Sequence, residues 1–177
     1  MTESSYVYSD DSRFFGEVLS RQEGGESFLE IGVGNGGNIG WVADKFKLVV
    51  GTDINDLRVA RTRAPENEFI LADRATCFRE LSFDVVAFNP PYVPSNEVID
   101  KTVDGGPNGI EIPLEFLKSA LKVIKRTGRI LVLLSSEDSM NMFHDFCDEH
   151  DLSVRRLDER NLFFEKLVVY ELKVRRA

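Results

Sequence analysis

The chain has 177 residues and a formal net charge of −8 at pH 7, with 42% hydrophobic and 29% charged residues. This composition excludes a disordered chain, and the length predicts one domain. No apolar run approaches the roughly 20 residues of a membrane span, and the acidic N-terminus lacks the features of a secretory signal. Two cysteines cannot build a disulfide framework, so we expect a reducing cytoplasm. The acidic charge disfavours a broad nucleic-acid-binding face.

Apolar runs alternate with amphipathic segments of helical length along the chain. The earlier apolar runs are mostly β-branched and uninterrupted, as in strands that are covered on both faces, so the pattern predicts an α/β, doubly wound, mostly parallel sheet. The last two runs have no helix between them and predict a hairpin, whose antiparallel strand ends the sheet. Strands are predicted at 27–31, 48–52, 68–72, 83–88, 129–134, 153–158 and 166–174. Helices are predicted at 13–19, 38–47, 56–64, 112–125 and 139–149.

A Gly-x-Gly-x-Gly loop formed by Gly32, Gly34 and Gly36 follows the first predicted strand. Glycines allow the backbone to turn sharply, and they let a ligand lie against the main chain. Glu30 stands two places before the first glycine, where an acid suits a cationic group, such as a sulfonium or an amino group, better than a pyrophosphate. The alternative is a strand–helix turn that holds no ligand.

Two more acidic residues end predicted strands. Asp53 ends the second, at about the 20-residue spacing beyond the glycines at which an acid accepts ribose hydroxyls. Its alternative role is to cap the helix that starts near Asp56. Asp73 ends the third strand and is followed by Arg74; the position is also common for loops and caps. Because parallel strands end at one edge of a sheet, these acids should line the same ligand site as the glycine loop.

The tetrapeptide Asn89-Pro90-Pro91-Tyr92 ends the fourth predicted strand. Consecutive prolines stop the strand, lock the backbone and hold the residue before each of them extended. The Asn89 side chain and the Pro90 carbonyl thereby become two fixed acceptors, with the ring of Tyr92 beside them. Two acceptors that hold both N–H bonds of a planar amino or amide group can aim its nitrogen at a methyl donor and stabilise the positive charge that develops there. The alternative is a rigid turn.

These motifs resemble those of the class I methyltransferases, which use S-adenosylmethionine. The tetrapeptide resembles the signature of the members that methylate adenine N6, guanine N2 or glutamine amides. The resemblance implies a seven-stranded, Rossmann-like sheet whose C-terminal strand is antiparallel, with S-adenosylmethionine as cofactor, S-adenosylhomocysteine as product and no metal in this chain. It implies catalysis by the tetrapeptide and places Asp73 beside the adenine amino group. The cofactor-binding residues that it implies are Ser12, Glu30, Gly32, Gly34, Gly36, Asp53, Ile54, Asp73, Arg74 and Asn89.

Two further segments resemble the HemK family, which methylates the glutamine of the Gly-Gly-Gln loop in class-1 translation release factors. Residues 104–109 contain a Gly-Gly-x-x-Gly element similar to that family's, with a flexible loop as the alternative. Residues 6–12 resemble its Tyr-x-Pro-x-Glu-Asp-Ser/Thr segment, in which the Ser/Thr contacts the cofactor; helix capping is the alternative. By this resemblance, residues 1–26 form an extension whose short helix covers the cofactor site, and residues 27–177 form the methyltransferase domain.

The short chain resembles the eukaryotic and archaeal branch of that family. Several members of that branch need a small zinc-binding activator subunit, which covers an exposed edge strand and apolar surface of the catalytic domain. The resemblance therefore implies a heterodimer, with the activator on the third strand, 68–72, and the zinc in the activator. The alternative function is adenine-N6 or guanine-N2 methylation of nucleic acid, which predicts a salt-dependent affinity that the acidic charge disfavours.

Overall fold

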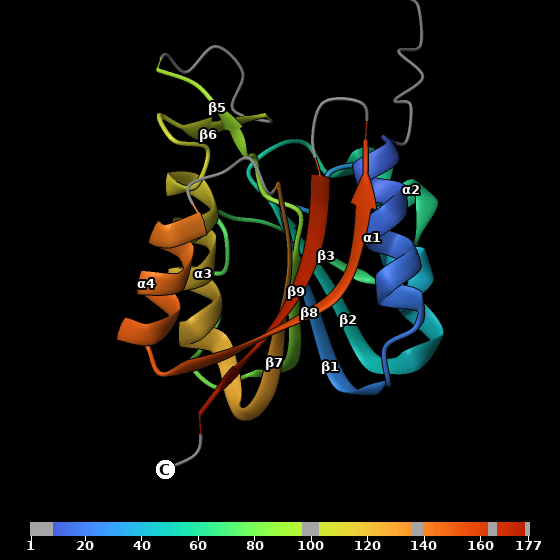
Figure 1. The fold of residues 1–177 in the computed structure, drawn as a ribbon. Coiled ribbons are helices and arrows are strands. Elements are labelled where there is room, and N and C mark those ends of the chain that lie inside the picture. The colour runs from blue at the N-terminus through green and yellow to red at the C-terminus, as the bar shows by residue number, and fades with distance from the viewer. Residues whose placement is uncertain (1–8, 97–102, 136–139, 163–165, 176–177) are drawn as a thin grey trace, which may run out of the picture.

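The computed structural model describes residues 9–96, 103–135, 140–162 and 166–175. Within these ranges seven strands form one sheet and two short strands form another (Figure 1). No helix among them is long and apolar enough to cross a membrane. The strands are β1 (Gly25–Ile31), β2 (Phe46–Asp53), β3 (Glu68–Leu71), β4 (Phe83–Phe88), β5 (Val93–Pro94), β6 (Asp104–Gly106), β7 (Ile124–Ser135), β8 (Leu152–Asn161) and β9 (Lys166–Val174). The helices are α1 (Asp10–Ser20), α2 (Arg58–Arg63), α3 (Glu111–Val123) and α4 (Met140–Glu149), with the 3-10 turns η1 (Ile39–Trp41) and η2 (Ala43–Lys45).

The strand order of the large sheet is β3-β2-β1-β4-β7-β9-β8. The pairs from β3 to β7 are parallel, and β9 is antiparallel to both β7 and β8. The mostly parallel sheet with an antiparallel C-terminal strand is thus confirmed. The expectation that the antiparallel strand ends the sheet is wrong, because β9 lies inside it and β8 forms the edge. Burial explains the order: β9 buries Leu167, Val168 and Val169, whereas most β8 side chains are exposed or half-buried.

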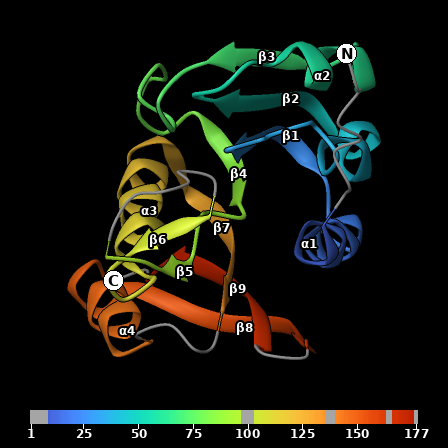
Figure 2. The same ribbon diagram turned by 90° about the horizontal axis from the view of Figure 1, so that it is seen from above.

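Helices cover both faces of the sheet, so the core has two halves (Figures 1 and 2). On one face, α1, η1 and α2 pack on the sheet around Phe14, Phe15 and Phe28. On the other face, α3 and α4 pack around Leu117 and Phe143. The N-terminal helix therefore shares one core cluster with the strands.

The helix predicted at 38–47 is wrong. The segment forms the turns η1 and η2, and Phe46 already belongs to β2. Gly40 and β-branched Val42 lower the helix propensity here. Phe46 is buried against the ring of Phe28, at 5.2 Å between centroids, which draws the end of the segment into the strand. The other predicted helices and strands are present with shifted ends, and β5 and β6 are too short to leave a pattern in the sequence.

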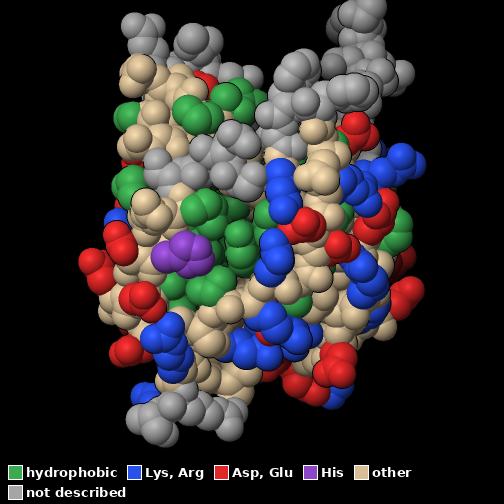
Figure 3. All heavy atoms as spheres, viewed as in Figure 1, with side chains coloured by type: hydrophobic (Ala, Val, Ile, Leu, Met, Phe, Trp, Pro, Cys, Tyr) green, Lys and Arg blue, Asp and Glu red, His purple; other side chains and the backbone are tan. Residues whose placement is uncertain are grey.

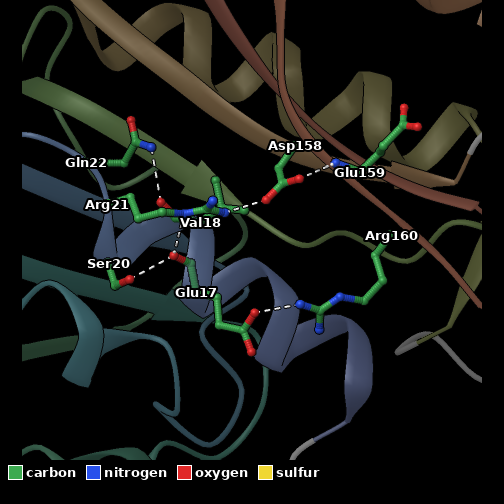
Figure 4. Close-up of polar contacts among 8 residues, drawn as sticks. All are labelled: Glu17, Val18, Ser20, Arg21, Gln22, Asp158, Glu159 and Arg160. Carbon is green, nitrogen blue, oxygen red and sulfur yellow. Dashed lines mark hydrogen bonds and ion pairs between the residues drawn. The ribbon is translucent and has the colours of Figure 1, made fainter.

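Helix α1 is fastened to β8 by ion pairs (Figure 4). Arg160 places Nη2 2.5 Å from Glu17 Oε2, and its guanidinium carbon lies 4.6 Å from the ring centroid of Phe14. One turn further on, Arg21 Nη2 lies 2.5 Å from Asp158 Oδ2. The N-terminal helix is thus held both by its buried face and by the polar face that it turns toward β8.

Candidate active site

The predicted site residues lie at the carboxyl ends of neighbouring parallel strands. Gly32 follows β1, Asp53 ends β2, Asp73 follows β3 and Asn89 follows β4. Figure 2 looks onto this edge of the sheet, where β5 and β6 also lie. Since β1 to β4 are neighbours in the sheet, the fold brings these residues together as the sequence predicts.

The glycine loop turns sharply and is tied to β2. Gly32, Gly34 and Gly36 have φ angles of 75°, 53° and 75°, in the left-handed region that glycine adopts without strain. A Cβ atom at Gly34 would meet nothing within 4 Å, so its main chain is open to a ligand. Asp53 Oδ2 accepts the Gly34 N–H at 2.9 Å, and Oδ1 accepts the Asn55 N–H at 2.8 Å. Asp53 therefore fastens the loop and does not cap α2, whose N-cap is Leu57.

Glu30 is a buried carboxyl group beside this loop, with 2% of the residue exposed. Its Oε1 accepts a hydrogen bond from Asn38 Nδ2 at 2.9 Å, and its buried Oε2 has no hydrogen-bond partner among the described residues. Burial raises the Glu30 pKa to about 8; the Asn38 hydrogen bond lowers it, and the charge of Asp53 adds to the rise. A cationic ligand would offset the cost of desolvating the Glu30 carboxylate. The position of Glu30 therefore suits the cationic ligand group that the sequence predicts.

The turn after β3 presents Asp73 on the surface. Asp73 Oδ1 lies 3.3 Å from Arg74 Nη1, and the Asp73 carbonyl accepts the Thr76 hydroxyl at 2.7 Å. Arg74 has a φ of 51°, an uncommon conformation for a residue with a side chain. Ile54, after β2, is 53% exposed. Asp73 and Ile54 are thus accessible at the edge where the glycine loop lies.

Two side chains of the tetrapeptide contact one carboxylate on α1. Asn89 Nδ2 donates to Asp11 Oδ2 at 2.8 Å, and the Tyr92 hydroxyl donates to the same oxygen at 3.3 Å. Asn89 Oδ1 is buried and has no hydrogen-bond partner among the described residues. The predicted acceptor of a substrate N–H is therefore available. The sequence prediction gave Asp11 no role in the site, although Asp11 stands at the Asp of the segment that residues 6–12 resemble.

The Gly-Gly-x-x-Gly element packs against the tetrapeptide. A Cβ atom at Gly105 would lie 2.6 Å from Tyr92 Cα, and β6 pairs with β5 just beyond Tyr92. Glu111 accepts hydrogen bonds from the Asn108 main-chain N–H at 3.1 Å and from its side-chain amide at 2.6 Å. This element is therefore held by strand pairing and hydrogen bonds and packs against the tetrapeptide, in contrast to the flexible-loop alternative.

The N-terminal motif lies only partly within the described residues, because 6–8 fall outside them. Ser9 occupies the N-cap position of α1, but its hydroxyl donates to Ser12 Oγ at 2.9 Å and caps no backbone N–H. Ser12 is half-buried, one residue from the carboxylate that contacts the tetrapeptide. Among the described residues, no cluster of His, Cys, Asp or Glu is placed to hold a metal.

Comparisons with known proteins agree with this geometry. A family model described as a methyltransferase domain matches residues 29–90, from within β1 into the tetrapeptide. The structure also resembles a chain of the Mtq2–Trm112 complex of E. cuniculi, with a TM-score of 0.76 and 25% identity over 93% of this chain and 95% of that one. The chain has the class I methyltransferase fold. The E. cuniculi complex is responsible for methylation of the translation termination factor eRF1.

Two relatives confirm the resemblance to glutamine methyltransferases. A protein of Methanocaldococcus jannaschii, named as a protein N5-glutamine methyltransferase, is 33% identical over 120 residues, 61% of each chain. The release factor glutamine methyltransferase of Caulobacter vibrioides is 30% identical over 135 residues, 64% of this chain and 46% of that one. The chain thus covers less than two thirds of the length of either relative.

The same methyltransferase fold occurs in TrmK of M. capricolum, which was solved with S-adenosylhomocysteine. The TM-score is 0.66, with 14% identity over 91% of this chain and 67% of that one. That likeness extends to the fold alone.

Proposed function

We propose that this chain is an S-adenosylmethionine-dependent methyltransferase that acts in the cytoplasm on a class-1 translation release factor. It methylates the side-chain amide nitrogen of the glutamine in the Gly-Gly-Gln loop. The observation that carries the proposal is Asn89 Oδ1, a buried acceptor without a partner among the described residues, at the strand end beside the glycine loop. The glutamine methyltransferases among the relatives support the choice of substrate.

The cofactor would be held along the ends of β1, β2 and β3. When bound, S-adenosylmethionine supplies an electrophilic methyl group on a positively charged sulfur. Glu30 offsets cationic charge from its buried position beside the loop. Asp53 uses one lone pair of each oxygen on a main-chain N–H and keeps others for ribose hydroxyls. Asp73 would be the residue that holds the adenine amino group. The remaining cofactor contacts come from Ser12, Gly32, Gly34, Gly36, Ile54, Arg74 and Asn89.

The tetrapeptide would orient the substrate amide. An amide nitrogen is a poor nucleophile, because its lone pair is delocalised into the carbonyl group. Asn89 Oδ1 and the Pro90 carbonyl accept its two N–H bonds, which aims the nitrogen and stabilises the positive charge that develops on it. Pro90 and Pro91 keep both acceptors in place, and the ring of Tyr92 packs beside the amide. The methylated nitrogen gives up its proton to solvent water after it has gained charge, so no strong base is needed before attack.

The chain would work as the catalytic subunit of a heterodimer. Its edge strand β3 carries Ile70 and Leu71, which are 37% and 64% exposed. An apolar edge strand is an aggregation liability unless something covers it. The covering subunit that we propose is the small zinc-binding activator, which would supply its own zinc. The Mtq2–Trm112 assembly supports this arrangement.

The test is a transfer assay with methyl-labelled S-adenosylmethionine, a class-1 release factor and this chain, with and without the activator. One methyl group on the loop glutamine, located by mass spectrometry, is the expected result. Asn89→Ala should lower kcat by about 100-fold or more, as for other preorganised groups that stabilise transition-state charge. Asn161→Ala, on the exposed face of β8, is the matched control. Label in adenine or guanine of added nucleic acid, with none in the release factor, would replace the proposal by the nucleic-acid alternative.

A further inference from the structure

We propose that Asp11 is a positioning residue that sets the orientation of the Asn89 amide, a proposal that rests on the proposed function. Its Oδ2 accepts from Asn89 Nδ2 at 2.8 Å and from the Tyr92 hydroxyl at 3.3 Å. One carboxylate oxygen on α1 thus holds both the first and the last side chain of the tetrapeptide. Asp11 itself does not touch the substrate; it acts through Asn89.

The chemistry of the pair fixes which way the amide faces. A carboxylate only accepts hydrogen bonds, whereas a primary amide has a donor end and an acceptor end. Asn89 must therefore turn its NH2 group toward Asp11, which leaves Oδ1 on the opposite side, where it is buried and has no partner among the described residues. With the amide reversed, an NH2 group would meet the N–H bonds of the substrate amide, and two donors cannot pair.

Asp11 reaches this position because α1 is fixed at several points. Phe14 and Phe15 are 2% and 0% exposed, in the core cluster on the face of the sheet that α1 covers. Glu17 pairs with Arg160 of β8 on the polar side of the helix. The first turn of α1 therefore stands beside the end of β4, although Asp11 and Asn89 are 78 residues apart in the sequence.

Two other roles for Asp11 make different predictions. If Asp11 only favours the N-terminus of α1 through its charge, removing the charge of Asp10 in the same turn should have the same effect. If it only helps to cover the cofactor, its loss should weaken cofactor binding. A positioning role predicts a loss in kcat with unchanged cofactor affinity.

The experiment compares Asp11→Asn with Asp10→Asn in the complex of the full chain and its activator. For Asp11→Asn, kcat should fall by about 10-fold to 100-fold, the loss of a hydrogen bond to a charged group, because the new amide pairs with either orientation of Asn89. The Kd for S-adenosylhomocysteine, from calorimetry, should change less than about twofold in both variants, as should kcat for Asp10→Asn. Equal loss of kcat in both variants, or a weaker Kd with unchanged kcat, would overturn the proposal.

A second readout needs no substrate. The side-chain amide of Asn89, assigned in nitrogen-15 spectra by its loss in Asn89→Ala, should give two well-separated proton signals in the parent chain. In Asp11→Asn these signals should move together or broaden, and in Asp10→Asn they should stay in place. If they shift as expected while the parent transfers no methyl group to a release factor, the proposed function fails and the hydrogen bond stands. If they do not shift, the positioning role of Asp11 is wrong.

Discussion

Glu30 combines a structural cost with a functional use. Its carboxyl group is buried, it receives one hydrogen bond from Asn38, and its other oxygen has no partner among the described residues. Burial disfavours the charged form, which accounts for the raised pKa. A cation in the proposed cofactor site would favour the charged form again. Glu30 thus destabilises the chain without cofactor, and its charge favours the binding of a cationic cofactor.

We expect Glu30→Gln to stabilise the chain at pH 8 and to change its stability little at pH 4.5. The Glu30 pKa rises from 4.5 to about 8 on folding, so its contribution to stability is fully present below pH 4.5 and is lost as the pH rises to 8. Glutamine stays neutral and still accepts from Asn38, so the gain should be on the order of a few kcal/mol. Urea unfolding at both pH values measures it.

A control variant and a binding measurement test whether the Glu30 result is specific. Glu66→Gln changes an exposed carboxyl group and should leave the pH dependence of the free energy of unfolding unchanged. The same Glu30→Gln variant should bind S-adenosylmethionine more weakly, because it lacks the charge that offsets a cation. If the difference in unfolding free energy between Glu30→Gln and the parent chain were equal at pH 4.5 and pH 8, the burial argument would be contradicted.

The Gly-Gly-x-x-Gly element determines where the tetrapeptide stands. Its strand β6 lies so close to Tyr92 that Gly105 has no room for a side chain. We expect Gly105→Ala to displace the tetrapeptide and to lower kcat by about 100-fold, the effect of a 1 Å misplacement. The overpacking should also lower the free energy of unfolding by about 1–3 kcal/mol. Steady-state methyl transfer and urea unfolding measure the two effects.

Gly40→Ala is the matched control, since a Cβ atom at Gly40 would meet nothing within 4 Å. It should leave kcat unchanged. If Gly105→Ala kept full activity with a normal unfolding free energy, the Gly-Gly-x-x-Gly element would be a loop that does not position the tetrapeptide.

The elements that the sequence predicts well are those whose pattern is local. The largely buried strands β1, β2 and β4 follow from their apolar runs, and the glycine loop and the tetrapeptide follow from their own residues. The hydrogen bond between Asp11 and Asn89 joins residues 78 positions apart, so it depends on the docking of α1. The order of β8 and β9 likewise depends on which strand the finished sheet buries, and no short window of sequence contains that information.

At the scale of the whole molecule, the two edges of the sheet differ in how they avoid pairing with another chain. Charged side chains cover β8, the edge in front in Figure 3, and many form ion pairs there. Such charges hinder the addition of another strand. At the opposite edge, β3 presents the exposed side chains of Ile70 and Leu71. The β3 edge is therefore the surface that a partner subunit would cover.

We expect Leu71→Lys to have opposite effects on the isolated chain and on the complex. The isolated chain should aggregate less in light scattering, because a lysine blocks edge pairing. Binding of the activator, by calorimetry, should weaken by about 10-fold to 100-fold, since the burial of one leucine side chain is lost. Met142→Lys, on α4 and 38% exposed, places the same charge away from β3 and should change neither quantity. Unchanged activator binding by Leu71→Lys would move the proposed interface away from β3, because a buried ammonium group without a partner cannot be accommodated at no cost.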